Sequence, residues 1–151
     1  MAIDVDIQIA VEDQPLPEAD DFQRWVKTAL TNQIDEAELC IRIVSSEESQ
    51  ELNSTWRGMD KPTNVLSFPF EAPPGFSSAM IGDLAICAEV VASEAQAQNK
   101  PLMAHWAHMV IHGVLHLIGF DHIKDADAEE MEALEIQLLA QLDIPNPYIS
   151  A

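Results

Sequence analysis

Three histidines constrain the possible fold of this chain more than any other feature, because their spacing predicts both a helix and the turn that ends it. The segment reads HGVLHLIGFDH and contains His112, His116 and His122. Residues four apart share one face of a helix at roughly 6 Å, so His112 and His116 can converge on one ion at about 2 Å each. Gly119 can adopt the left-handed conformation that ends a helix, after which the chain can bring His122 to the same ion. The segment therefore predicts a metal site with three protein ligands and an open fourth position.

The ligand type and one missing residue narrow the chemistry of this site. Three imidazoles favour zinc, while copper, nickel and iron stay compatible with them. A zinc with three protein ligands and one open position is typical of catalysis. The same spacing occurs in a zinc-peptidase motif, in which Glu follows the first His as the general base. Gly113 stands at that position here. Proteolysis is therefore disfavoured, although a peptidase or another hydrolase with a different base remains an alternative.

Two further histidines lie on the same predicted helix. His105 is roughly 10 Å along the axis from His112, too far to share its ion. His108 is one turn from His112 and can support a ligand, contact a substrate, or complete a four-ligand structural zinc in a non-catalytic protein. For both, hydrogen bonding without a role in metal binding is the simpler interpretation. A separate face of this helix is predicted to be core: Trp106, Val110, Val114 and Leu117.

Hydrophobic periodicity predicts an α+β fold in one domain, residues 1–151. Alternating or continuous apolar runs predict strands at 3–9, 39–43, 65–70 and 80–87, with a possible bulge at Gly82 and Asp83. Helical spacing and capping patterns predict helices at 18–33, 45–56, 88–99, 101–118 and 126–142. We therefore expect a small mixed β-sheet packed against about five helices.

Composition bears on partners and location. The formal charge is −19 with only seven Lys and Arg, which opposes RNA binding because affinity for phosphate chains depends largely on basic side chains. The acidic run from Asp125 through Glu135 is predicted to be a solvated helix face. No signal-peptide pattern opens the chain, and no apolar stretch approaches the roughly 20 residues of a membrane helix, so a cytoplasmic location is expected. Cys40 and Cys87 lie in apolar runs and are predicted to be buried, reduced thiols.

Three sequence blocks resemble the YbeY family of zinc-dependent endoribonucleases, which act in ribosomal RNA maturation and ribosome quality control. The first is the histidine segment, and the similarity covers most of the chain from Leu52 to the acidic helix after His122. The other blocks are LN followed by Arg57, continuing into DKPTNVLSFP at 60–69, and IGDLAI at 81–86. The resemblance implies a zincin-like fold and cleavage of single-stranded RNA at the 3′ end of 16S rRNA.

Carried over to this chain, the resemblance places the zinc ligands at His112, His116 and His122. It implies that Arg57 acts in catalysis together with His112. A guanidinium can hold a phosphate bidentately and offset charge developing at phosphorus. Lys61 is close to Arg57 in sequence, but a solvated lysine is the simpler interpretation. Asn64 stands where many relatives have Asp, so the resemblance does not extend to a role that needs a carboxylate at this position.

The predicted site is compatible with two nucleophiles for RNA cleavage. Zinc can activate a water molecule as the nucleophile, or polarise the phosphate while the 2′-hydroxyl of the RNA attacks. Asp83 and Asp121 are candidates for a base or for orienting a histidine. The expected partners are single-stranded rRNA and the small ribosomal subunit, with no membrane and no DNA. Because the overall charge disfavours RNA, delivery of the substrate by a ribosomal or assembly-factor protein is a further hypothesis.

Overall fold

Four strands and five helices make up the elements of the described chain. The computed structural model describes residues 2–12, 14–31, 33–70, 75, 79–119 and 125–148. Every predicted strand and helix is present, with end points shifted by a few residues, and the expected small mixed sheet is confirmed. The elements in chain order are β1 (Ala2–Ile9), α1 (Ala19–Leu30), β2 (Glu36–Val44), α2 (Ser46–Arg57), β3 (Val65–Pro69), β4 (Met80–Cys87), α3 (Ala88–Ala97), α4 (Leu102–Leu117) and α5 (Asp125–Ala140).

The sheet has the strand order β1-β2-β4-β3, and β3 lies at one edge. β1, β2 and β4 are parallel, whereas β3 pairs antiparallel with β4. The predicted bulge is confirmed, because Glu38 pairs with Met80 while Leu39 pairs with Gly82, leaving Ile81 as the extra residue. Gly82 has a φ of 143°, and a Cβ at this position would lie 2.3 Å from the carbonyl oxygen of Phe68. The bulge therefore requires glycine where β3 and β4 approach each other.

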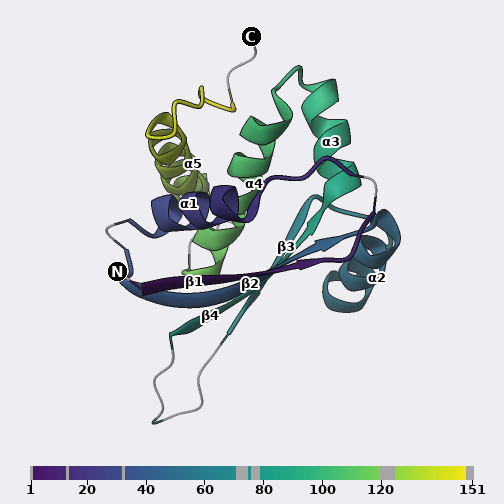
Figure 1. Cartoon of the computed structure of the whole chain (residues 1–151), viewed down its shortest axis with the longest axis horizontal. Coiled ribbons are helices and arrows are strands. Elements are labelled where there is room, and N and C mark those ends of the chain that lie inside the picture. The colour runs from purple at the N-terminus through teal and green to yellow at the C-terminus, as the bar shows by residue number, and fades with distance from the viewer. Residues whose placement is uncertain are drawn as a thin grey trace.

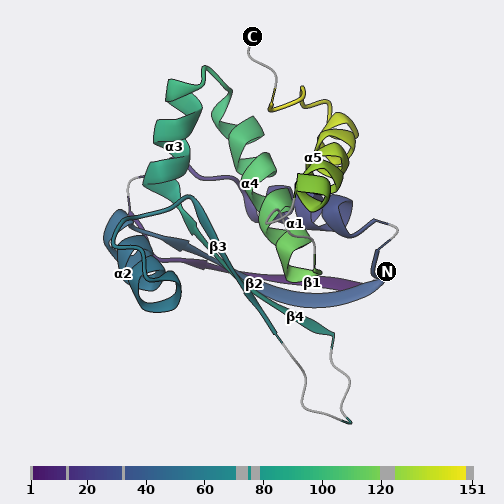
Figure 2. The same cartoon turned by 180° about the vertical axis from the view of Figure 1, so that it is seen from behind.

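The helices divide between the two faces of the sheet. In both views α1, α4 and α5 lie on one side, with α3 beside α4, and α2 lies on the other side (Figures 1 and 2). The strands alternate accordingly. Leu84 and Ile86 face the large core, while Ala85 and Cys87 belong to a smaller cluster that contacts Leu52 of α2.

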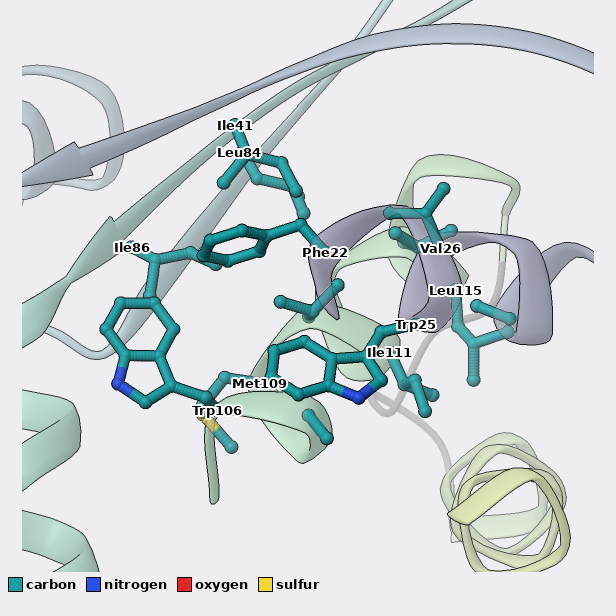
Figure 3. Close-up of a cluster of buried hydrophobic side chains, with 14 of the residues drawn as sticks. Phe22, Trp25, Val26, Ile41, Leu84, Ile86, Trp106, Met109, Ile111 and Leu115 are labelled. Atoms are coloured by element: carbon teal, nitrogen blue, oxygen red, sulfur yellow. The ribbon is translucent and has the colours of Figure 1, made fainter. Parts of the chain in front are cut away.

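The large core surrounds α4, which is buried along most of its length. Figure 3 shows side chains of α1 and α4 meeting those of β2 and β4. Phe22 contacts Trp25 and Trp106 edge-to-face, with ring centroids 5.8 and 5.9 Å apart. The predicted apolar face of α4 is confirmed, since Trp106, Val110, Val114 and Leu117 are all buried. This packing fixes the helix that carries the histidines.

Two smaller expectations have clear outcomes. Cys40 and Cys87 are both free thiols, but only Cys87 is fully buried. Burial, followed by the charge of nearby Asp6, raises the pKa of the Cys40 thiol. None of the described helices combines the length and the apolar character needed to cross a membrane.

Candidate metal centre

The four described histidines of α4 form a row along one side of the helix. Neighbouring rings from His105 through His108 and His112 to His116 have centroids 6.2, 6.2 and 4.7 Å apart. His105 and His108 are buried, whereas the side chain of His112 is 25% exposed and His116 is half-buried. The row therefore leads from the interior toward solvent, and among the described residues it is open to a ligand at its His112–His116 end.

His112 and His116 present their Nε2 atoms to each other at 3.2 Å. Two nitrogens bound to one tetrahedral zinc at about 2.0–2.1 Å each would lie about 3.3 Å apart. The pair is thus already spaced for a shared ion. Gly119 follows α4 with a φ of 105°, which confirms the predicted left-handed turn. His122 and Asp121 lie outside the described residues.

A buried glutamate of α5 holds the other side of His112. The Oε1 atom of Glu135 is 2.8 Å from His112 Nδ1, and its Oε2 atom is 2.6 Å from both His108 Nε2 and the Tyr148 hydroxyl. Burial favours a neutral Glu135, but the hydrogen bonds from His108 and His112 outweigh it and lower its pKa to about 2. Glu135 is therefore an acceptor, and His112 donates its Nδ1 proton to it. This leaves the Nε2 lone pair of His112 directed toward His116, as in carboxylate–histidine–zinc arrangements.

The same residues offer a second possible ligand set. Ligand atoms of His108, His112 and Glu135 lie within 4.8 Å of one another and could hold a metal. However, Glu135 is only 2.6 and 2.8 Å from the two imidazole nitrogens, which are hydrogen-bond distances. Ligands sharing a tetrahedral ion would have to separate to about 3.3 Å. The His112–His116 pair needs no such movement, so we assign Glu135 to orienting His112.

Glu135 corrects the interpretation of the acidic run. The run was expected to be a solvated helix face, and Asp127, Glu129 and Glu130 are indeed exposed. Glu135, however, is 0% exposed. The sequence held a signal for this, because Glu135 is four residues from both Met131 and Leu139, which face the core. Tyr148 was also missed, and no local pattern around it indicates a contact with α5.

His105 belongs to a separate hydrogen-bonded group at the buried end of the row. Its Nε2 atom is 2.9 Å from Glu94 of α3, so the hydrogen-bonded interpretation of His105 is confirmed. Asn64 donates to both oxygens of Glu94 at 3.1 and 3.3 Å, and its own oxygen accepts from the Val65 amide. An amide suits this position because an aspartate would place a second carboxylate beside Glu94.

Two other candidates, Arg57 and Asp83, do not belong to the hydrogen-bonded group of histidines in the described parts of the chain. Arg57 is exposed at the end of α2 and, within the described parts of the chain, makes no ion pair or hydrogen bond with His112 or His116. The side chain of Leu84 packs against Gly113 of α4. The side chain of the preceding residue, Asp83, points to the opposite face of β4 and lies near Cys40. Asp83 therefore faces the opposite side of the sheet, and its candidacy as the base of this site is wrong.

Comparisons with known proteins agree with the fold and with one family. A family model described as endoribonuclease YbeY matches residues 6–143. The solution structure of TM1509 from Thermotoga maritima is similar to this chain with a TM-score of 0.62 and 24% sequence identity, covering 93% of this chain and 88% of that one. The structural likeness bears on the fold alone, and with it the expected zincin-like α+β fold is confirmed.

Proposed function

Since this chain belongs to the YbeY endoribonuclease family, we propose that it cuts single-stranded RNA at the metal centre of α4. Membership makes the chain an endoribonuclease of rRNA processing. The finer proposal is maturation of the 3′ end of 16S rRNA and late-stage quality control of the ribosome. The observation that carries the site is the 3.2 Å approach of the Nε2 atoms of His112 and His116.

We propose zinc as the ion, with His112 and His116 as two ligands and His122 as the third. Bound zinc would supply a Lewis acid that polarises phosphate or lowers the pKa of water. Both nitrogens of His112 have assigned partners, since Nδ1 donates to Glu135 and Nε2 faces His116. His112 therefore contributes by holding the ion and does not itself transfer a proton.

Glu135 is a poor candidate for the general base of this reaction. It accepts hydrogen bonds from three side chains, and its pKa is lowered to about 2. A base needs a pKa close to the operating pH. Water on the ion would lose its proton without a protein base, whereas the 2′-hydroxyl of the RNA would have to pass its proton to a group other than Glu135. Only attack by the 2′-hydroxyl predicts products ending in 2′,3′-cyclic phosphate and no cleavage of DNA.

Arg57 is proposed to hold a phosphate of the bound RNA. Its guanidinium is exposed and has no carboxylate partner among the described residues, so its donors are available for bidentate phosphate binding. The proposed partners are single-stranded rRNA and the small ribosomal subunit, reached in the cytoplasm. Delivery through a ribosomal or assembly-factor protein would compensate for the acidic charge of the chain.

The packing of Gly113 argues against the peptidase alternative. A Cβ at this position would lie 2.8 Å from Leu84 Cδ2 and 3.2 Å from Val65 Cγ2. A side chain there would point into the sheet, where it has no path to the ion. A glutamate at this position, which serves as the base in the peptidase motif, would therefore have to displace Leu84 and Val65.

The test compares zinc-loaded wild type with His112→Ala and Arg57→Ala on RNA that contains both paired and unpaired segments. We expect wild type to cut the unpaired segments. His112→Ala should lose zinc and activity together, whereas Arg57→Ala should keep zinc and lose activity. Arg24→Ala is a matched control, because Arg24 is an exposed arginine already paired with Asp21. Equal cleavage by all four proteins would indicate a contaminating nuclease and contradict the assignment.

A further inference from the structure

The proposed RNA substrate leads to a surface that the catalytic site does not include. We propose that Trp56, Phe68 and Phe70, with Met59, form an aromatic surface that stacks unpaired bases of single-stranded RNA entering the site. This inference rests on the proposed function. It attributes RNA binding mainly to base stacking, because the net charge of −19 opposes binding through phosphate contacts alone.

Three of the four side chains of the aromatic surface are exposed to solvent although they are large and apolar. Trp56 is 67% exposed, Phe70 46% and Met59 41%, and these three are half of the six exposed large hydrophobic side chains in the described chain. The Trp56 ring meets Phe68 edge-to-face at 6.1 Å. Phe70 continues the ladder, since its amide donates to Ile81 O at 3.0 Å. Phe68 and Phe70 are therefore on the same side of the strand.

The loop that flanks this surface is held in place by buried polar side chains of α2. Ser49 donates to Thr63 O and accepts from Thr63 N, both at 2.9 Å. Asn53 donates its side-chain amide to Lys61 O at 2.8 Å, and its backbone carbonyl accepts from the Met59 amide at 3.2 Å. The exposed side chains thus project from an ordered backbone, which reduces the entropy lost on binding.

The aromatic surface and the histidines lie on either side of the same edge strand. Ser67 of β3 donates to the carbonyl of Gly113, the residue after His112, at 3.1 Å. Its neighbour Phe68 points the other way and contacts Trp56. β3 is the last strand of the sheet. A single RNA strand crossing this edge can therefore contact both regions.

The charges on this surface are mixed, because Asp60 stands between Met59 and Lys61 and the exposed Asp83 pairs with Phe68 across the ladder, so affinity has to come mainly from stacking. Arg57 and Lys61 lie beside Trp56 and Met59, and neither forms an ion pair within the described ranges. Two cations would give a slope of only about −1.4 in log affinity against log salt for a single strand. Stacking of one base contributes about 5- to 150-fold in affinity and needs an unpaired base. The surface therefore predicts selectivity for single strands with weak salt dependence.

The tryptophans provide a direct measurement of stacking. Trp25 and Trp106 are 3% and 0% exposed, so Trp56 is the solvent-exposed emitter of the three. The probe is an unstructured 2′-O-methyl oligocytidine, which lacks the attacking hydroxyl, compared with a blunt RNA duplex. We expect the oligocytidine to quench the Trp56 emission and the duplex to leave it unchanged. Absence of quenching by the single strand would overturn the proposal.

Kinetics with cleavable RNA give the second measurement. We expect Trp56→Ala to raise KM at least about five-fold with kcat within about two-fold, and Trp56→Phe to recover most of the loss. Ile9→Ala is the matched control, because Ile9 is 61% exposed on β1. Cleavage with an unchanged KM in Trp56→Ala would overturn the aromatic surface and leave the proposed function standing. Quenching by single strands without any cleavage would support the surface and contradict the proposed function.

Discussion

Two histidine–carboxylate pairs on the same helix behave as different kinds of site. His105 and His112 each meet a glutamate from a neighbouring helix, Glu94 at 2.9 Å and Glu135 at 2.8 Å. The Glu94 side chain is 33% exposed, while that of Glu135 is 0% exposed. The exposure of the imidazoles follows the opposite order, since His105 is nearly fully buried and His112 is partly open to solvent.

The difference between the pairs lies in what the second ring nitrogen meets. His105 Nδ1 is buried and has no hydrogen-bond partner among the described residues. His112 Nε2 faces the Nε2 atom of His116 at 3.2 Å. A histidine–carboxylate pair thus orients an imidazole in either case, but it supports a metal site only where a second ligand shares the exposed side.

Removing a ligand should have the largest effect. We expect His116→Ala to weaken zinc binding beyond about 100-fold, more than the loss of an orienting partner causes, while His105→Ala leaves it unchanged. Competition with a chromogenic chelator measures both. If zinc binding survived in His116→Ala but not in His108→Ala, the ion would instead occupy the set formed by His108, His112 and Glu135.

Removing the orienting carboxylate should have the next largest effect. Glu135→Gln can still accept at one oxygen but no longer carries charge, so we expect zinc affinity to fall by about 10- to 100-fold. Glu94→Gln is the matched control at the other pair and should bind zinc as wild type does. Nitrogen NMR of the metal-free protein should show His112 protonated at Nδ1 in wild type. A mixture of tautomers in wild type would contradict the assigned role of Glu135.

Substitution of Gly113 tests whether packing or chemistry excludes the peptidase. Gly113→Glu would force a charged side chain against Leu84 and Val65 in the core. Overpacking alone costs about 1–3 kcal/mol, and the unpaired charge adds to this, so we expect a clearly lower melting temperature and no peptide cleavage. Peptidase activity in a stable Gly113→Glu protein would show that position 113 reaches the ion after all.

The sequence predicted α4 and the turn after it better than it predicted the residues that support its histidines. The apolar spacing and the Gly119 turn depend on local chemistry, so residues close in sequence revealed them. Glu135 and Tyr148 contact His108 and His112 across 23 to 40 residues, and such contacts exist only once α5 has packed on α4. Glu135 was also hidden by its acidic neighbours, although the apolar residues four positions away on either side marked its face as buried.

The smallest expected effect concerns the buried end of the histidine row at low pH. The hydrogen bond from His105, opposed by burial and aided by Asn64, lowers the pKa of Glu94. A lowered pKa means that Glu94 stabilises the folded state above its ordinary value of 4.5, and that this contribution is lost as pH falls below it. Because Glu94 is partly exposed, the contribution should stay below about 1 kcal/mol. Urea unfolding at pH 7 and pH 3 should show a smaller loss of stability on acidification in Glu94→Gln than in wild type. An equal loss in both proteins would mean that the charge of Glu94 does not contribute to the stability of the fold.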